Sequence, residues 1–145
     1  MKNVKPIPEG YTTVTPYLMV NGAAKLIQFL KDAFGAEQIS LHEGEDRKVM
    51  NAEIRVGSSM VMVADAMRGH QPKAAMFYLY FKDCDAVFKA AVKAGGKPVI
   101  EPTNMFYGDR SGAVQDPCGN DWWIATHIED VSPAELEKRA AQQNR

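Results

Sequence analysis

Two stretches of the sequence, TPYLMVNGAAKLIQFLKDAFGAEQI (residues 15–39) and MFYLYFKDCDAVFKAAVKAGGKPVI (residues 76–100), follow one pattern. They align without a gap at an offset of 61 residues, which places Leu18 on Leu79 and Gly35 on Gly96. Each copy reads as an alternating strand, a short polar connection, an amphipathic helix of about 13 residues and a glycine stop. Because an internal repeat decides the architecture, we expect two equivalent modules.

The segments after each copy are also alike, since both contain one strand followed by two strands joined by a turn. In the first copy these strands are EQISLHE, RKVMNAEIRV and SMVMVADA, with VGSS as a tight hairpin turn. In the second copy they are KPVIEPT, a strand around RSGAVQ, and NDWWIATH, joined by DPCG. The sequence therefore predicts an α+β fold of two βαβββ modules in a pseudo-twofold arrangement that forms a cleft-bearing mixed sheet.

The modules are expected at about residues 11–66 and 75–128 of one domain that spans residues 1–145, with the polar segment ADAMRGHQPKAA between them. Residues 1–10 hold two of the eight prolines and predict an extended arm. A C-terminal helix is expected at about residues 132–142, because Ser132 is a suitable N-cap, followed by Pro133 and, in the capping-box position, Glu135.

Composition excludes several classes of function. The chain of 145 residues carries 17 basic and 18 acidic residues, without the basic patch that nucleic acid requires. The N-terminal segment lacks an apolar signal region, and no window approaches the roughly 20 apolar residues of a membrane span. Two cysteines, Cys84 and Cys118, do not make a disulfide framework. We therefore expect a soluble, cytoplasmic protein.

Period-two alternation sorts the opening strand of each module into two faces. Aliphatic and phenylalanine side chains on one face should pack on the helices. The opposite faces should line a cleft that holds a ligand, or simply pack between the sheets. The side chains on these opposite faces are Tyr17, Met19, Met76, Tyr78 and Tyr80.

Several motifs carry a resemblance to a known superfamily. The segments VTPYLMV, AFGAE, NAEIRVG, FYGDRSG, DPCGN and ATHIEDVSPAELEKRA occur in this order between about residues 11 and 142. Together with the paired βαβββ modules they resemble the vicinal oxygen chelate superfamily of glyoxalase I, extradiol dioxygenases and bleomycin-resistance proteins. More narrowly, they are similar to its PhnB-like branch. The resemblance implies the fold and a homodimer, but the superfamily hosts many functions on one scaffold.

Metalloenzymes of that superfamily place four ligands, usually histidine or glutamate, on the inner strands. The matching positions here are Thr15, its repeat mate Met76, Val63 or a neighbour if the hairpin shifts register, and Trp123. This set cannot supply the nitrogen and carboxylate donors that a divalent ion needs. We therefore expect neither a metal nor another cofactor. The three histidines, His42, His70 and His127, would need a different geometry and read better as solvated side chains.

Glu53, in NAEIRVG, matches a glutamate that is usual in the branch. With a two-residue hairpin turn at VGSS it faces away from Val63, and with a three-residue loop it faces the cleft. As a cleft residue it is a weak candidate for a general base, provided that burial raises its pKa. As an ordinary strand residue it would pair with Arg55 or with solvent.

FYGDRSG holds further candidates for ligand contact. Arg110 could bind a carboxylate or phosphonate through two hydrogen bonds, and Tyr107 could add a donor. Alternatively, Asp109 and Arg110 could form a salt bridge around Gly108. Ser111 lacks a GxSxG motif and is an improbable nucleophile. In DPCG, aspartate, proline and glycine occupy the positions that favour a type I turn, so Asp116 is expected to be architectural.

These observations favour a metal-independent protein that binds a small molecule in an aromatic cleft. The main alternative is a metal-dependent lyase, isomerase or dioxygenase that uses Glu53, and a third possibility is a dimerising module without a ligand. Residues expected to bind the ligand are Thr15, Tyr17, Val63, Met76, Tyr78, Tyr107, Arg110 and Trp123.

Overall fold

The computed structural model describes residues 3–67 and 69–143. The first two residues of the expected N-terminal arm and residue 68 of the expected linker lie outside the described residues. Module one contains β1 (Tyr17–Val20), α1 (Ala23–Phe34), β2 (Glu37–Glu43), β3 (Val49–Val56) and β4 (Ser59–Asp65). Module two contains β5 (Met76–Tyr80), α2 (Cys84–Lys93), β6 (Lys97–Asn104), β7 (Asp109–Gln115) and β8 (Asp121–His127), and α3 (Pro133–Gln143) follows.

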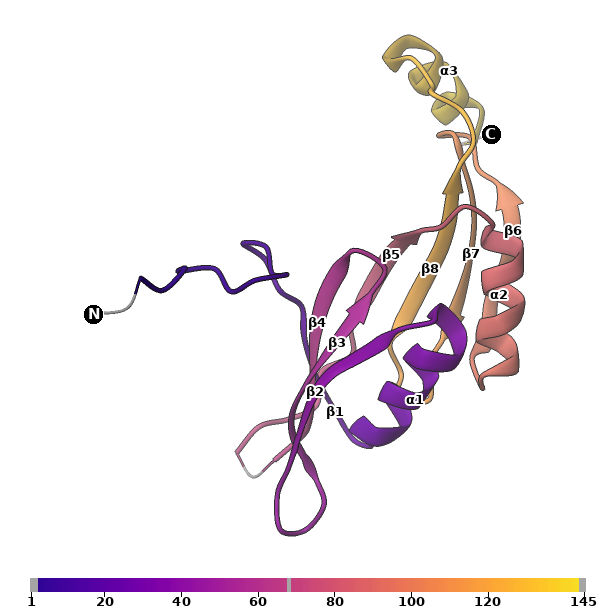
Figure 1. Cartoon of the computed structure of the whole chain (residues 1–145). Helices are drawn as coiled ribbons and strands as arrows, with labels where there is room; N and C mark the ends of the chain where they lie inside the picture. The colour runs from indigo at the N-terminus through magenta and orange to yellow at the C-terminus, as the bar shows by residue number, and fades with distance from the viewer. Residues whose placement is uncertain (1–2, 68, 144–145) are drawn as a thin grey trace.

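Each module forms one four-stranded mixed sheet. The strand orders are β1-β4-β3-β2 and β5-β8-β7-β6, so the two modules have the same topology. In both sheets the first strand is parallel to the last, and the remaining pairs are antiparallel. A parallel pair needs a long crossover, which the intervening helix and hairpin provide. The α+β fold of two βαβββ modules is thus confirmed, and Figure 1 shows α1 and α2 close to each other beside the sheets.

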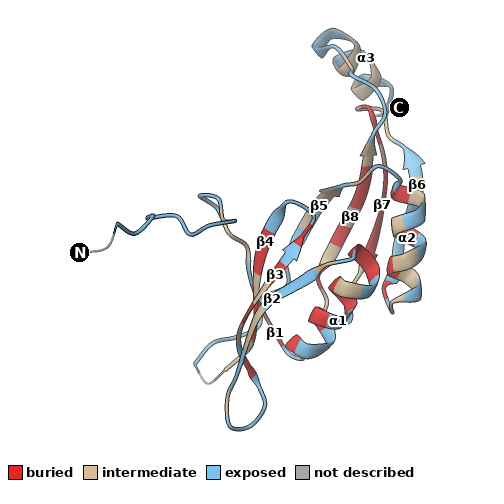
Figure 2. Ribbon diagram, in the orientation of Figure 1, coloured by how far each residue is buried: buried red, intermediate tan, exposed pale blue. Residues whose placement is uncertain are grey.

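The core lies between the sheets and these two helices (Figure 2). Alternation places Leu18 and Val20 of β1 in it, each 2% exposed, as the pattern predicted. An aromatic cluster joins the modules, because Phe34 of α1 lies 5.7 Å from Phe81 and 5.4 Å from Trp122, ring centre to ring centre. Phe77 stacks on Trp122 at 4.5 Å. Burial of each large ring contributes roughly 2–3 kcal/mol to the free energy of folding.

The two modules attach their helices at equivalent positions with different chemistry. In module one the carboxylate of Asp65, at the end of β4, accepts hydrogen bonds from the backbone N–H groups of Gly22 and Ala23, at 3.1 and 2.8 Å. Its repeat mate, Thr126, uses a hydroxyl to accept from the N–H of Cys84 at 3.0 Å. The last strand of each module thus satisfies N–H groups that the first turn of its helix leaves free.

The DPCG turn is built around Asp116, which is 4% exposed. Its side chain accepts hydrogen bonds from the N–H of Cys118 at 2.7 Å and from the N–H and side-chain amide of Asn120 at 3.1 and 2.9 Å. It also accepts from the indole N–H of Trp122 at 2.7 Å. The predicted architectural role of Asp116 is therefore confirmed, and the aspartate ties the turn to the core.

The described part of the N-terminal arm and α3 extend from the body of the molecule in Figure 1. The described arm residues before Tyr11 are exposed, and α3 buries none of its residues. The predicted cap of α3 is present, because the N–H of Glu135 donates to the Ser132 hydroxyl at 3.2 Å. Arg139 ties the helix to Glu129 at 2.7 Å. Within residues 3–67 and 69–143 no helix has the length and apolar character to cross a membrane.

Candidate functional site

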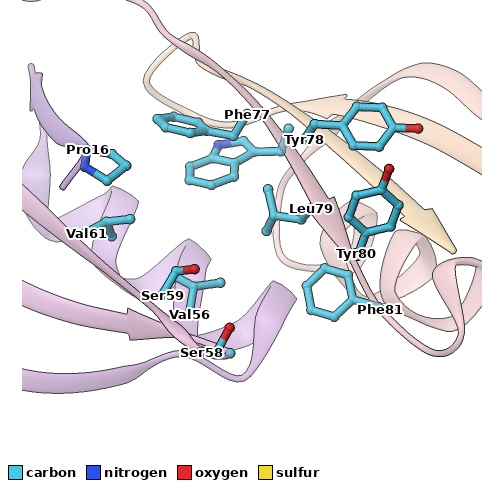
Figure 3. A pocket seen from close by; sticks show the side chains of 12 residues that line it. Pro16, Val56, Ser58, Ser59, Val61, Phe77, Tyr78, Leu79, Tyr80 and Phe81 are labelled. Carbon is cyan, nitrogen blue, oxygen red and sulfur yellow. The ribbon is translucent and has the colours of Figure 1, made fainter. Parts of the chain in front are cut away.

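The face of module two that points away from the helices carries an exposed aromatic surface. Register places Met76 beside Asp121, Tyr78 beside Trp123 and Tyr80 beside Ala125 on this face. The side chains of Met76, Tyr78 and Tyr80 are 66%, 40% and 62% exposed. Figure 3 shows the alternation along β5, with the tyrosines on one side and the phenylalanines on the other. The prediction that these tyrosines face away from the helices is correct.

Three of these rings form what we call the aromatic row, Tyr80–Tyr78–Trp123. The ring centres of Tyr78 and Tyr80 are 5.4 Å apart, and those of Tyr78 and Trp123 are 6.2 Å apart with planes at 15°. The hydroxyl of Tyr107 lies 3.3 Å from that of Tyr78. Met76, Tyr78, Tyr107 and Trp123, all predicted to bind a ligand, line one hollow of about 390 Å³ together with the backbone neighbour Phe77.

Asp109 connects the aromatic row to the end of β8. Its carboxylate accepts hydrogen bonds from the hydroxyls of Tyr78 at 2.7 Å and Tyr80 at 2.9 Å. It also pairs with Nδ1 of His127 at 2.8 Å, while Nε2 of the same ring lies 2.7 Å from Asp130. The salt bridge between Asp109 and Arg110, one of two alternatives for this loop, does not form. His127 is held between two carboxylates rather than simply solvated.

This network keeps Asp109 ionised and the tyrosines protonated. Burial opposes ionisation of Asp109, but hydrogen bonds from His127, Tyr78 and Tyr80 hold its pKa below the ordinary value. Burial and the neighbouring hydroxyl and carboxylate raise the pKa of Tyr78, and the hydrogen bond to Asp109 raises that of Tyr80. Asp109 and Asp130 raise the pKa of His127. The tyrosines are therefore neutral donors and acceptors, not bases.

The corresponding face of module one belongs to a different hollow. Tyr17 and Met19 line a space of about 540 Å³ with residues 69–71 and 73–75 of the linker. Thr15 is half-buried just before β1. The expectation that Tyr17 shares one cleft with Met76, Tyr78 and Trp123 is thus corrected to two hollows, because each sheet keeps its own open face within the chain.

Val63 does not line either hollow, contrary to the prediction. It is fully buried against Leu18 in the core, while its neighbour Met62 stands beside Tyr17 on the open face. The turn is the two-residue type, because Val56 pairs with Ser59. The repeat itself contains the missed signal, since an offset of 61 places Trp123 on Met62, not on Val63.

Glu53 pairs with Met62 and therefore lies on the open face of module one. As the two-residue turn predicts, it faces away from Val63. Its carboxylate accepts hydrogen bonds from the hydroxyl of Tyr11, in the N-terminal arm, and from that of Ser40 at 2.7 Å. These two bonds outweigh burial and lower the pKa of Glu53. The condition for a general base, a raised pKa, is therefore not met.

Arg110 points to the helix side of module two, so its predicted contact with a ligand in the aromatic hollow is wrong. Its guanidinium binds both oxygens of Asp85 in α2, at 2.9 and 3.0 Å, and the side chain of Asn104 at 3.1 Å. Arg110 pairs with Thr126 across the sheet, whereas Asp109 pairs with His127 on the aromatic side. One residue of register separates the two faces.

The four positions where metalloenzyme relatives hold their ion do not fit one here. With the register correction they are Thr15, Met62, Met76 and Trp123, and none offers the imidazole or carboxylate that a divalent ion prefers. Across the part of the chain that the structure describes, no three histidine, cysteine or acidic side chains gather in a way that could hold a metal ion.

A third hollow, of about 400 Å³, lies between the modules (Figure 3). One wall is formed by Pro16 and the β3–β4 hairpin of module one. The other is formed by residues 77–81 of β5 and the loop after it, together with Trp122. The half-buried Cys118 lies at another junction of the modules, with Sγ 3.4 Å from the carbonyl oxygen of Asn21. Burial raises the pKa of this thiol to about 11, so it is not a thiolate at neutral pH.

Comparison with known proteins agrees with this architecture. Residues 11–124 match the family described as the Glyoxalase/Bleomycin resistance protein/Dioxygenase superfamily. The chain belongs to this superfamily. Its members include functions as different as those three names, so membership leaves the activity open.

Several similar proteins align with this chain over nearly their full length. The uncharacterized protein Mb0911c of Mycobacterium bovis is 28% identical, with 97% of this chain and 96% of that protein covered. An Arabidopsis thaliana gene product of known structure is 26% identical with a TM-score of 0.66, covering 79% of this chain and 98% of that one. A PhnB protein from Bacillus cereus has a TM-score of 0.62 at 16% identity, over 79% of this chain and 99% of that one, which shows the shared fold alone.

Proposed function

We propose that the chain is a metal-independent small-molecule binding protein of the glyoxalase/bleomycin-resistance kind. The observation that carries this proposal is Trp123, which stands where metalloenzyme relatives hold a carboxylate and instead lies parallel to Tyr78 in the wall of an open hollow. The motifs FYGDRSG and DPCGN support a place in the PhnB-like branch.

The hollow suits a flat, partly apolar ligand. Its volume of about 390 Å³ lies within the range of small-molecule sites. Trp123 and Tyr78 present ring faces, and stacking on such faces adds to the gain from burying area. Covering ~100 Å² of this surface with a ligand ring would contribute roughly 2.5 kcal/mol to the binding free energy.

We also propose that the protein is a homodimer. Tyr17 of module one and Met76 and Tyr80 of module two are more than half exposed on open sheet faces. Within one chain these faces line separate hollows, so a second copy could cover the module-two face with its own module one. Sedimentation velocity at micromolar concentration should give about twice the mass of 16.0 kDa, and a monomer would contradict this part of the proposal.

Thermal-shift screening tests the binding function. A panel of aromatic ligands, including glycopeptide-like compounds, should contain members that raise the midpoint of unfolding, since a ligand that binds the native state stabilises it by mass action. Divalent metals should not. Trp123→Ala should abolish the shift, whereas Val99→Ala, at an exposed position of β6, should retain it.

The alternative, a metal-dependent lyase, isomerase or dioxygenase, makes the opposite prediction. A stoichiometric divalent ion in the purified protein, together with a turnover that chelation abolishes, would overturn the proposal. Equal ligand-induced shifts in the wild type and Trp123→Ala would move the binding site away from the aromatic hollow.

A further inference from the structure

The hydroxyl groups of the aromatic row have a fixed polarity. Tyr78 and Tyr80 both donate their protons to Oδ2 of Asp109, and His127 pairs with Oδ1. Both tyrosines therefore have their donor hydrogen committed, and the Tyr78 oxygen also accepts from the Tyr107 hydroxyl at 3.3 Å. The Tyr80 oxygen keeps its lone pairs for another partner. A ligand that approaches the row meets acceptors, and it needs N–H or O–H donors of its own to satisfy them.

Two carboxylates and one histidine determine the charge of this face. At the positions of β5, β7 and β8 that share the face, the ionisable side chains other than the tyrosines are Asp109, Asp121 and His127. Asp109 is 4% exposed, so its charge is poorly screened by solvent. Lys97 of β6 stands beside Gln115, at the edge of the sheet opposite β5. On this face of β5, β7 and β8, an anionic ligand would find no lysine or arginine, because Arg110 of β7 points to the helix side.

A buried hydroxyl at the base of the row lacks a partner. Ser111 is fully buried and, among the described residues, its Oγ makes no hydrogen bond. Ser111 stands beside Ala125 on β8, whose other neighbour is Tyr80, and its hydroxyl is close enough to Tyr78 to favour the phenolate of that residue. Because Ser111 is fully buried, its hydroxyl faces Tyr78 rather than a ligand bound on the row.

We propose that the aromatic row and Asp109 bind an organic ammonium cation that carries an aromatic ring. This inference rests on the proposed binding function and names the chemical class of its ligand. The ring lies on Trp123, and the ammonium group lies over Tyr78 and Tyr80, whose ring faces attract cations. The ammonium N–H groups donate to the free lone pairs of the Tyr80 oxygen, and the Asp109 carboxylate beneath the row supplies the opposite charge.

Three indole probes of similar size separate charge from stacking. Tryptamine carries an ammonium group, 3-ethylindole is neutral, and indole-3-propionate carries a carboxylate. Titration of the full-length protein at neutral pH, followed by ligand-observed NMR, should give a dissociation constant for tryptamine at least tenfold below that of 3-ethylindole. Indole-3-propionate should bind more weakly than both.

Matched variants locate the effect. Asp109→Asn should raise the dissociation constant of tryptamine at least tenfold and change that of 3-ethylindole by less than twofold. Asp32→Asn removes the same charge from an exposed position of α1 and should change neither dissociation constant. If Asp109→Asn does not fold, Tyr80→Phe is the second variant, because it keeps the ring and removes one acceptor. It should weaken the binding of tryptamine several-fold and leave the binding of 3-ethylindole unchanged.

The possible outcomes distinguish this inference from the proposed function. If all three probes bind equally well and Trp123→Ala abolishes their binding, the cation inference is overturned, but the stacking site of the proposed function remains. Tighter binding of the propionate would overturn it as well. Absence of tryptamine binding at millimolar concentration would overturn it whatever the other ligands do.

Discussion

Replacing Asp116 with alanine should cost the protein more stability than any surface change. Its carboxylate accepts four hydrogen bonds, from the N–H of Cys118, the N–H and amide of Asn120, and the indole of Trp122. Asn120 and Trp122 are 0% and 1% exposed, so water cannot easily replace the lost acceptor. Asp116→Ala therefore leaves at least two side-chain donors and one backbone donor buried without partners.

The expected cost follows from these orphaned donors. Each buried donor that loses its acceptor costs roughly 1–3 kcal/mol, with bonds to charged groups at the upper end. Some of the lost bonds will be recovered by relaxation of the turn, which is close to the surface at Cys118. We therefore expect a loss of about 3–5 kcal/mol in the free energy of unfolding.

Urea unfolding followed by tryptophan fluorescence measures this loss, because Trp122 reports on the affected site. Asp32→Ala, on the exposed face of α1, is the matched control and should change stability by under ~0.5 kcal/mol. A cost below ~1 kcal/mol for Asp116→Ala, with an unchanged slope against urea, would refute the view that this aspartate organises the turn and the tryptophan.

Three further predictions concern the faces, the arm and one loop. Val63→Ala should destabilise by about 2 kcal/mol and Met62→Ala by under ~1, as urea unfolding would show, because only the former opens a core cavity. Tyr11→Phe should cost about 1 kcal/mol at pH 7. This hydrogen bond lowers the pKa of Glu53. Its contribution to stability is therefore present above the unfolded pKa of about 4.3 and is lost as pH falls through the lower folded pKa. In acid titrations the difference in stability between the wild type and Tyr11→Phe should shrink accordingly. Gly108→Ala should lower the melting temperature, because φ is 103° there and a Cβ would lie 2.3 Å from a carbonyl oxygen of the next loop.

Each of these predictions has a clear contrary result. Equal costs for Val63→Ala and Met62→Ala would reverse the assignment of the β4 faces. A Tyr11→Phe deficit that stays constant across the whole acid titration would separate Tyr11 from Glu53. For the loop, Gly57→Ala is the control, since it shares a positive φ of 58° but has open space around the added carbon. If the two glycine variants behave alike, backbone strain and not the close approach determines the cost.

Much of the fold follows from local patterns in the sequence. The repeat predicts both βαβββ modules, and alternation assigns the faces of β1 and β5 correctly, because each of these strands is apolar on one side and mixed on the other. The Asp116 turn and the Ser132 cap are also predicted, since their chemistry is confined to a few neighbouring residues.

The site was harder to predict because its contacts join distant strands. In β7 both faces are largely buried, so alternation does not tell Asp109 from Arg110. The partners of Asp109 lie on β5 and β8, and only the register of three strands brings them together. The cleft position assigned to Val63 belongs to its neighbour Met62, which the repeat offset of 61 aligns with Trp123.

The unequal helix attachments give the two halves of the molecule different responses to acid. Burial disfavours the charge of Asp65, but the N–H groups of Ala23, Val49 and Gly22 hold its pKa below the ordinary value. Its contribution is therefore present above a pH of about 3.9 and is lost as pH falls through the lower folded pKa. Thr126 carries no proton that titrates in this range. Hydrogen exchange followed as pH falls should therefore show the N–H of Ala23 losing protection before that of Cys84, so the two halves of one repeat would respond differently to proton concentration.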